Sequence, residues 1–436
     1  MILLILSALA ACGTPAPASI PTTQHSAQVA IAWFDLYLDL VKSTPGFTPP
    51  VASRAFGYAG ITLYEAVVPG MPDYQSLAGQ LTGLAPLPQP APGAAYHWPT
   101  VANGALADAT RNLFANATPE RMAAIDALED KLAGEFKSQL DPAVFDRSVR
   151  QGRAVADAIF QWAKTDGGHE GYLKNFPADY VPPAGPGKWI PTPPGFLTAM
   201  QPQWGQNRPF VIAAGSACAP EAPPPYSEDA ASQFYQQALE VRDTVANLTP
   251  EQRTIALFWA DDPSQTATPP GHSISITTQA LKQTGASLAT AAEAYARVGI
   301  AIADALISCW NTKYQYNLLR PITYIQMVID PKWNTPEVTD PVITPPFSEY
   351  TSGHSVQSAA AAQVLTDLFG DNFAFTDHTH DQRGFEPRSF SSFFAAADEA
   401  AISRLYGGIH YRAAIERGLE QGKCIGRQVS AVKFKK

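Results

Sequence analysis

Residues 286–312 read ASLATAAEAYARVGIAIADALISCWNT, and this alanine-rich, periodic stretch carries the clearest helical pattern of the chain. Alanine is the strongest helix former, so a segment of this length and composition predicts a long helix. Glu293, Arg297 and Asp304 lie within it, which makes the segment too charged to span a membrane. We expect an amphipathic or buried helix, and because strand-like alternation is sparse elsewhere, we expect an all-α protein.

The same helical periodicity recurs in ten further segments of the chain. They are residues 27–43, 52–68, 101–115, 119–139, 145–164, 227–246, 250–258, 354–369, 391–406 and about 412–434. Thr118-Pro119 and Thr249-Pro250 each place a capping hydroxyl before a proline at the first helical position. The chain therefore predicts a protein made of helical bundles.

Long proline-rich connections separate these helices, at 81–99, 176–208, 217–225 and 331–347. Loops of this length in compact domains usually carry function or wrap the surface. We place a proline-rich connection at 176–225 between an N-terminal helical bundle at 26–175 and a C-terminal helical bundle at 226–436. This division leaves open whether the two bundles share one core.

Length and charge exclude several classes of protein. A chain of 436 residues buries a large core and is no small disulfide scaffold. The 30 Lys and Arg residues face 39 Asp and Glu residues, so the net charge is −9. No basic patch marks a nucleic-acid partner, and beyond the N-terminus no apolar run is long enough for a membrane span. Any bound anion must be held by a local cluster of donors.

The first 25 residues predict a signal and tether. Residues 1–11 are almost wholly apolar and end in the pattern LAAC at 9–12, which resembles a bacterial lipoprotein signal with lipidation at Cys12. We expect export to the bacterial cell envelope, lipid-anchored or periplasmic; a short hydrophobic start with a chance cysteine is the alternative. With Cys12 lipidated, Cys218, Cys309 and Cys424 allow at most one disulfide.

The first unusual segment is WNTKYQYNLLRP at 310–321. Lys313 and Arg320 are seven residues apart, so on a continuous helix they lie on nearly the same face, two turns apart. Pro321 disfavours helix at Arg320, and the helix is expected to end there, with the arginine extending into a pocket. Taken alone, such a pair more often forms a solvated stripe.

The second segment is YTSGHS at 350–355, directly before an alanine-rich helix. Ser352 and Gly353 open the helix, where free backbone N–H groups and the helix dipole favour an anion. His354 would lie beside that anion, and its near-neutral pKa suits proton transfer. An ordinary capped helix with a surface histidine is the alternative.

The third segment is SRLYGGIHYR at 403–412. Six residues of uninterrupted helix would turn His410 about 240° away from Arg404. The pair Gly407-Gly408 can break the helix and let both side chains converge. A helix end followed by a structural histidine is the alternative.

Together the three segments predict a site for a tetrahedral oxyanion such as phosphate or vanadate. Three cations are available, namely Lys313, Arg320 and Arg404. Ser352 and Gly353 are neutral donors, His354 is an acid–base group, and His410 is a nucleophile or ligand. Charge-assisted hydrogen bonds from such a set fit the oxygens of the anion.

The spacing K-x6-R-P, then S-G-H, then S-R-x5-H resembles the vanadium-dependent haloperoxidases, which share a superfamily with phosphatidic acid phosphatases of type 2 and bacterial acid phosphatases. The segments FWADD at 258–262 and TPPGH at 268–272 are similar to soluble haloperoxidases as well. The resemblance is firm over about residues 250–426. It implies a fold like that of vanadium chloroperoxidase, with two helical bundles.

The resemblance also implies vanadate as cofactor, with phosphate able to occupy the same site. It gives His410 as the vanadium ligand, His354, His410 and Lys313 as catalytic residues, and Lys313, Arg320, Ser352, Gly353, Arg404 and His410 as the cofactor-binding set. Hydrogen peroxide, a halide and a small organic molecule are the implied partners. Trp310 and Phe347 match positions near the halide in chloroperoxidases, although core packing explains aromatic residues there equally well.

Two positions depart from the family pattern. Thr351 replaces a proline, which keeps the helix opening. Ala414 lies four residues after His410, where many members carry an aspartate that helps orient the histidine. We expect a backbone carbonyl, Asp261 or Asp262 to take its place.

Two other functions stay open at this point. The same pocket could hydrolyse a phosphate ester through a phosphohistidine, or an exported lipoprotein could bind the oxyanion without turnover. Residues 377–381 (DHTHD) could hold a metal, but adjacent alternation without a distant third ligand favours a polar loop. His272 is interpreted as part of a loop or channel wall.

Overall fold

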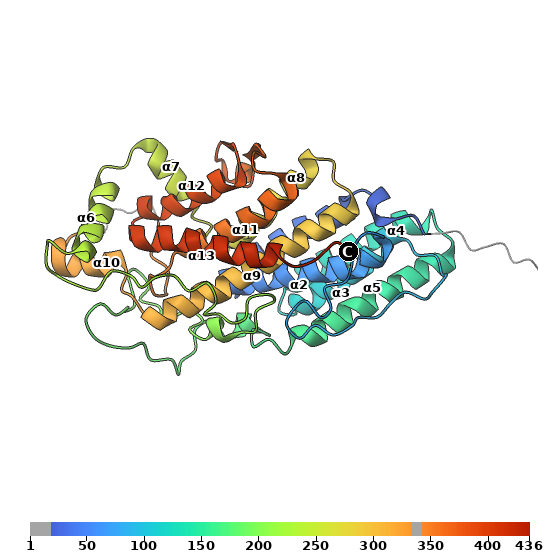
Figure 1. Ribbon diagram of the computed structural model, residues 1–436, viewed down its shortest axis with the longest axis horizontal. Helices are drawn as coiled ribbons and strands as arrows, with labels where there is room; N and C mark the ends of the chain where they lie inside the picture. Colours follow the sequence, from blue (N-terminus) through green and yellow to red (C-terminus); the bar gives the residue numbers. More distant parts are fainter. Residues whose placement is uncertain (1–18, 334–341) are drawn as a thin grey trace, which may run out of the picture.

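The computed structural model describes residues 19–333 and 342–436, and helices dominate it throughout (Figure 1). The longer helices are α1 (Gln28–Ser43), α2 (Pro49–Val67), α3 (Trp98–Leu113), α4 (Pro119–Lys137), α5 (Pro142–Ala163), α6 (Gln233–Ala246), α7 (Pro250–Phe258), α8 (Thr268–Gln283), α9 (Leu288–Tyr316), α11 (Gly353–Phe369), α12 (Phe393–Tyr406) and α13 (Arg412–Ser430). The prediction of an all-α protein is confirmed.

Shorter elements lie between these helices. They are α10 (Pro321–Tyr324), a π-helical turn at Ile325–Ile329, and 3-10 turns at Thr22–Gln24, Val68–Gly70, Gly171–Leu173, Trp204–Gln206 and Asp381–Arg383. In the described part of the chain the strands are β1 (Phe375–Asp377) and β2 (Arg388–Phe390), which pair antiparallel. No helix of the described residues has the length and apolar character to cross a membrane.

Helix α9 runs through the middle of the molecule and belongs to both bundles (Figure 1). On one side it packs against α2, on the other against α11 and α13. The backbones of α2 and α9 touch at Gly60, where an added Cβ would meet the Tyr295 carbonyl oxygen at 2.4 Å. Because one apolar cluster contains residues of both halves, the two bundles share a core.

The charged residues of the 286–312 stretch are explained by buried pairing. Glu293 accepts a hydrogen bond from Arg297 one turn later. Asp304 is fully buried and accepts the backbone N–H groups of Phe210, Val211 and Ile212 at 2.7–3.0 Å. Burial raises the pKa of Asp304 to about 6. Asp304 thus ties the proline-rich connection to the central helix.

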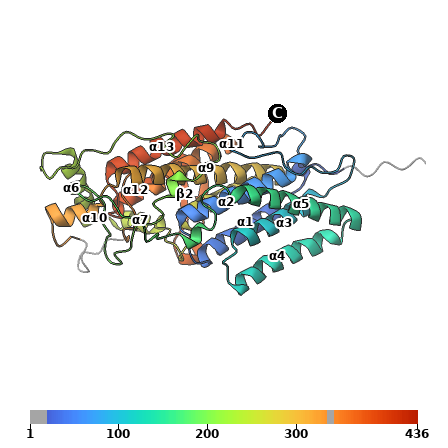
Figure 2. The same cartoon turned by 90° about the horizontal axis from the view of Figure 1, so that it is seen from below.

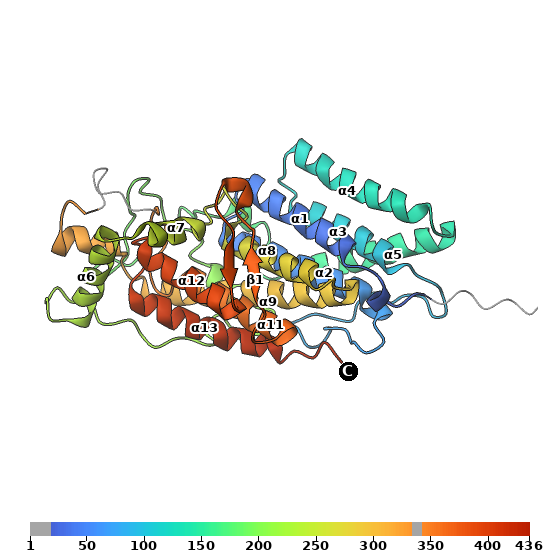
Figure 3. The ribbon, with the colours of Figure 1, turned by 90° about the horizontal axis from the view of Figure 1, so that it is seen from above.

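The remaining helices complete the two halves. In the N-terminal half, α4 stands at the outer edge, as Figures 2 and 3 show. Of its side chains only Ile125, Glu129 and Leu132 are buried. In the C-terminal half, α11 lies between α9, α12 and α13. A disulfide between Cys218 and Cys424 joins the connection to α13, while Cys309 stays reduced and buried. Cys12 lies outside the described residues. For the three remaining cysteines we expected at most one disulfide, and one is present.

Two helix predictions were wrong. Residues 268–283 form α8, although Pro269, Pro270 and Gly271 suggested a loop; prolines are tolerated in the first turn, where backbone N–H groups have no helical partner. Helix α9 ends at Tyr316, because Asn317 adopts a left-handed conformation with φ 47°. Lys313 and Arg320 therefore do not share one helix face.

Candidate active site

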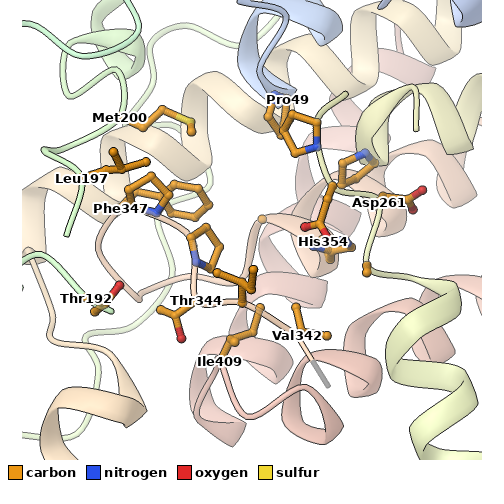
Figure 4. A pocket seen from close by; sticks show the side chains of 18 of the residues that line it. Pro49, Thr192, Leu197, Met200, Asp261, Val342, Thr344, Phe347, His354 and Ile409 are labelled. Carbon is orange, nitrogen blue, oxygen red and sulfur yellow. The ribbon is translucent and has the colours of Figure 1, made fainter. Parts of the chain in front are cut away.

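A cavity of about 420 Å³ opens beside the start of α11 and is largely lined by apolar side chains (Figure 4). Figure 4 shows His354 and Asp261 on one wall, with Phe347, Leu197 and Met200 opposite. Of the residues predicted from the three segments and their surroundings, the lining includes Trp310, Phe347, Gly353, His354, Arg404, His410, Asp261 and Asp262. Three distant segments therefore meet at one site.

The glycine pair brings His410 back toward Arg404, as predicted. Helix α12 ends at Tyr406, and Gly408 has φ 73°, a conformation that favours glycine. The Ile409 N–H then donates to the Arg404 carbonyl. This tight turn places His410 in the cavity wall, almost completely buried.

Glu349 orients His410. The His410 Nδ1 atom lies 2.8 Å from Glu349 Oε1, which also accepts the Tyr411 N–H at 2.9 Å. Burial raises the pKa of Glu349 to about 7, while Arg320 and Lys313 act in the opposite direction. Burial and the nearby cations hold the pKa of His410 well below its ordinary value. The imidazole is neutral, with Nδ1–H on Glu349, and its Nε2 carries the lone pair that a ligand atom needs.

Arg320 contacts the same histidine from the other side. Its Nε donates to the Phe347 carbonyl, and its Nη1 donates to the Ile409 carbonyl and lies 3.2 Å from His410 Nε2. Its Nη2 is buried without a partner among the described residues. Burial lowers the pKa of Arg320 to about 10, so the side chain stays charged and keeps donors available for an anion.

Lys313 lies below the site and is committed to the backbone. Its ammonium group donates to the carbonyls of Ser348, Glu349 and Thr351, which uses all three of its protons. Burial lowers its pKa to about 7. In this arrangement Lys313 contributes charge and holds the 348–351 backbone, whereas a direct bond to an oxyanion requires it to release one carbonyl.

The start of α11 has the predicted form. Ser352 caps the helix by accepting the Ser355 N–H, and Gly353 opens the first turn. A Cβ added at Gly353 would meet only the Trp310 ring, at 3.8 Å. The side-chain face of Gly353 is therefore open, which leaves room for an anion to approach the start of the helix.

His354 follows in the same turn, half-buried in the cavity wall. Its Nε2 has no partner among the described residues, and the ring faces the Trp259 backbone carbonyl. Since a carbonyl accepts, this arrangement favours the tautomer with the proton on Nδ1 and a lone pair on Nε2. Burial first, and then Arg404, keep the pKa of His354 well below its ordinary value, so the ring is neutral.

Arg404 closes the site from α12. It donates from Nη2 to the Ala256 carbonyl at 2.8 Å and from Nε to Ser403 Oγ at 2.9 Å. Burial lowers its pKa to about 10, and the charges of Asp261 and Asp262 oppose that shift. Asp261 itself bonds His272 and His380, and neither Asp261 nor Asp262 bonds His410. The expectation that one of them orients His410 was therefore wrong, because Glu349 occupies that place.

Trp310 and Phe347 lie together beside these cations. Their ring centroids are 5.0 Å apart. Lys313 Nζ lies 5.1 Å and the Arg320 guanidinium 4.9 Å from the centre of the Phe347 ring. The pair forms an apolar wall next to buried positive charge, as a weakly hydrated anion would favour.

Solved structures show which family the chain resembles. The chain is 38% identical to a bacterial vanadium-dependent iodoperoxidase, with a TM-score of 0.86 over 95% of this chain and 98% of the other. The chain belongs to the vanadium-dependent haloperoxidase family. Residues 293–435 also match the family model of the VCPO second helical-bundle domain.

Two more distant structures share the haloperoxidase fold. A holo-type bacterial vanadium-dependent chloroperoxidase has a TM-score of 0.69 at 17% identity, covering 90% of this chain and 93% of the other. An apo-type bacterial vanadium-dependent chloroperoxidase has the same TM-score at 15% identity, covering 94% and 98%. No curated protein sequence matches the chain.

The residues of this haloperoxidase fit the vanadate that its family implies. Arg320 Nη2 and His354 Nε2 are buried polar atoms without partners among the described residues. Such atoms are costly unless a bound group satisfies them. His410 Nε2 and the open first turn at Gly353 provide a ligand atom and backbone donors at the same place. These donors suit an oxyanion site in which one histidine provides the ligand atom.

Sequence reasoning missed some functional candidates of this haloperoxidase. Glu349 gave no signal, because it precedes His410 by 61 residues and no spacing rule joins them. His272, Asp377 and His380 were assigned to loops, but all three are buried, and Asp377 and His380 meet His272 and Asp261. The distant partner that the DHTHD segment lacked lies more than 100 residues earlier.

Proposed function

We propose that this haloperoxidase oxidises iodide with hydrogen peroxide and passes the oxidised halogen to a small organic molecule. The observation that supports it most is that His410 and His354 line one cavity, while Arg320 Nη1 lies 3.2 Å from His410 Nε2. The choice of iodide rests on the 38% identity to an iodoperoxidase. Vanadate bound here supplies the Lewis-acid centre that activates peroxide toward halide.

In this proposal His410 is the vanadium ligand and Glu349 keeps its Nε2 free of a proton. Arg320, Arg404, Ser352 and Gly353 hold the oxyanion through charged donors and backbone N–H groups. Lys313, whose ammonium form is stabilised by three carbonyl acceptors, adds a positive charge that polarises the site. Phosphate, with the same charge and shape, competes for these donors.

His354 is the acid–base group of the proposed reaction. Its neutral ring and unpartnered Nε2 suit it to accept a proton from hydrogen peroxide as peroxide binds. Its Nε2 atom is buried and has no partner among the described residues, so it is available for this proton. Trp310 and Phe347 form the apolar wall against which the halide approaches.

The outer part of the cavity favours an apolar organic substrate. Exposed apolar side chains ring its mouth, with Leu197 51% and Ile343 64% exposed. Exposed apolar groups beside a catalytic site commonly mark a binding surface. We therefore include an apolar, electron-rich acceptor such as a phenol in the proposal.

We also propose that the protein is exported, lipid-anchored through Cys12 or periplasmic. The disulfide between Cys218 and Cys424 supports this, because disulfides persist mainly outside the reducing cytoplasm. Labelling of the expressed protein with a fatty acid analogue, compared between wild type and Cys12→Ser, tests the anchor. Labelling independent of Cys12 would contradict it.

One assay series tests the proposed activity. Purified protein stripped of phosphate is assayed for iodide oxidation with peroxide, with and without orthovanadate, and for p-nitrophenyl phosphate hydrolysis. We expect iodide oxidation that requires both vanadate and peroxide. Phosphate ester hydrolysis inhibited by vanadate, without halide oxidation, would instead identify a phosphatase, and oxyanion binding without turnover would identify a receptor.

A further inference from the structure

A second group of buried ionisable side chains lies behind His354, away from His410. His272 Nδ1 lies 2.8 Å from Asp261 Oδ2, and its Nε2 lies 2.7 Å from Asp377 Oδ2. His380 Nε2 lies 3.1 Å from the other Asp261 oxygen. The four side chains, which we name the Asp–His cluster, are each at most 2% exposed.

His272 is charged in this arrangement. Both of its nitrogens face carboxylate oxygens at hydrogen-bond distance, so both must carry protons. Burial lowers its pKa, but Asp261 and Asp377 outweigh burial and raise it to about 10. The imidazolium in turn lowers the pKa of Asp377 to about 2. The core of the cluster is therefore an ionic bridge of one cation between two anions.

A divalent metal is a weaker explanation of the cluster. Asp261, His272 and His380 offer ligand atoms within 4.8 Å of one another. However, the two protons of His272 occupy both of its nitrogens. Asp261 Oδ1 and His380 Nε2 remain, and two ligands are fewer than protein zinc sites use.

The bridge joins three separate parts of the chain. His272 belongs to the second turn of α8, Asp261 follows α7, and Asp377 ends β1. The Trp259 ring stacks on His272, with ring centroids 4.3 Å apart and planes at 18°. The residues between α7 and α8 are thus held from both sides by charge and by stacking.

This segment needs such support. Asp261 and Ser264 have φ of 50° and 67°, a region that residues with side chains adopt at a cost. The segment also bears directly on the catalytic wall. The Trp259 carbonyl faces the His354 ring, and Asp261 and Asp262 line the cavity beside Arg404. A shift of this backbone would move the acceptor that fixes the proton of His354.

We propose that the His272 imidazolium, bridging Asp261 and Asp377, is a positioning device that fixes residues 259–262 and thereby the tautomer of His354. Its charge holds the two carboxylates together, and the bridged Asp261 holds the Trp259 carbonyl in place. His272 touches no reacting atom and acts only through this segment. The inference rests on the proposed function, since it assigns to His354 the role of base.

His272→Gln tests the proposal, because glutamine retains polarity but removes the charge. His378→Gln is the matched control: His378 lies in the same loop as His380, its side chain is 54% exposed, and among the described residues its ring bonds only Asp381. We expect His272→Gln to lower kcat for iodide oxidation about 10- to 100-fold, as loss of a supporting residue does at metal sites, with KM for iodide little changed. His378→Gln should match wild type.

The readout that a merely structural role would not change is the tautomer of His354 in vanadate-free protein. Long-range ¹H–¹⁵N spectra of histidine-labelled protein should show one Nδ1–H tautomer in wild type and a mixture in His272→Gln. The ionisable groups that face His354 are Arg404, Asp261, His272 and His410. The substitution His272→Gln removes the charge of His272 and leaves the other three side chains in place. An unchanged tautomer and kcat in a folded His272→Gln protein would overturn the proposal.

If His272→Gln does not fold, the proposal is tested with the variants Asp377→Asn and Asp377→Glu. Asparagine removes one anion of the bridge and should reproduce the loss of kcat, whereas glutamate retains charge and should recover part of it. Equal loss in both variants would overturn the proposal. So would a stoichiometric divalent metal in purified wild type that His380→Gln loses. Failure of wild type to oxidise halide would instead contradict the proposed function.

Discussion

The imidazole of His410 and the carboxylate of Glu349 lie 2.8 Å apart, entirely inside the protein. Glu349 precedes the start of α11 by four residues, and His410 follows the end of α12. This chain carries Ala414 four residues after His410, so no carboxylate is available at that position. The carboxylate that supports His410 comes instead from the segment before α11. Support for the ligand is preserved although the local pattern is not.

This pair predicts that Glu349→Gln weakens vanadate binding. A glutamine can still accept the Nδ1–H bond, but it loses the negative charge that makes the histidine a stronger ligand. Loss of such partners usually costs 10- to 100-fold in metal affinity, and we expect a rise of about that size in the vanadate Kd, measured by titration calorimetry. Glu240→Gln, which removes a half-exposed partner of Arg412, is the control. Equal affinities would refute the role of Glu349.

The two site histidines should separate binding from turnover. His410→Ala removes the proposed ligand and should abolish vanadate retention through gel filtration, measured by elemental analysis. His354→Ala leaves the ligand in place and should retain vanadate, while halide oxidation falls about 100-fold or more with the loss of its acid–base group. Vanadate retention by His410→Ala equal to that of wild type would contradict the ligand assignment.

Much of this site could be predicted from local sequence because its parts depend on local rules. Gly407-Gly408 predicted the turn that returns His410 to Arg404, and Ser352-Gly353 predicted an open helix start. These outcomes depend on backbone conformation over a few residues. The prediction that Lys313 and Arg320 share one helix face was wrong. Helical spacing does not reveal that Asn317 ends the helix between them.

The pairings between distant segments could not be predicted from sequence. Asp261, Asp377 and Glu349 reach their histidines across 11, 105 and 61 residues. Only the packing of α7, α8, α11 and β1 decides which carboxylate meets which histidine. The shared core was left open for the same reason, since helical periodicity does not tell on which two sides α9 packs.

The disulfide between Cys218 and Cys424 should stabilise the connection against α13. It closes a loop across 206 residues, and removal of a bridge of this kind typically costs about 2–5 kcal/mol. The double variant Cys218→Ser/Cys424→Ser should show that decrease in the free energy of unfolding by denaturant. Cys309→Ser, which removes a thiol outside the bridge, is the control for cysteine chemistry. A double variant as stable as wild type would contradict the prediction.

Leu197 at the cavity mouth tests the proposed apolar substrate. Leu197→Asp places a charge where an apolar ring would bind, and should raise the KM for a phenolic acceptor about tenfold. Triiodide formation without an acceptor should stay as in wild type. Val181→Asp is the matched control, because Val181 is an exposed apolar residue, 82% exposed, outside the cavity lining. A KM that does not respond to Leu197→Asp would indicate that the acceptor reacts elsewhere.

The ionic bridge at His272 predicts a specific pH dependence of stability. Asp261 and Asp377 raise the pKa of His272 from 6.5 to about 10, so its contribution is complete below pH 6.5 and is lost as pH rises toward 10. His272 lowers the pKa of Asp377 from 3.8 to about 2, so that contribution is present above pH 3.8 and is lost as pH falls through 2.

The difference in Tm between wild type and His272→Gln, measured without vanadate, should therefore be largest between about pH 4 and 6.5 and should shrink toward pH 10. His378→Gln should differ from wild type little at any pH, because its histidine is exposed. A difference that grows between pH 7 and 10 would mean that His272 is neutral in the native protein. In that case the carboxylates would have to carry the protons, and the bridge would be one of neutral hydrogen bonds.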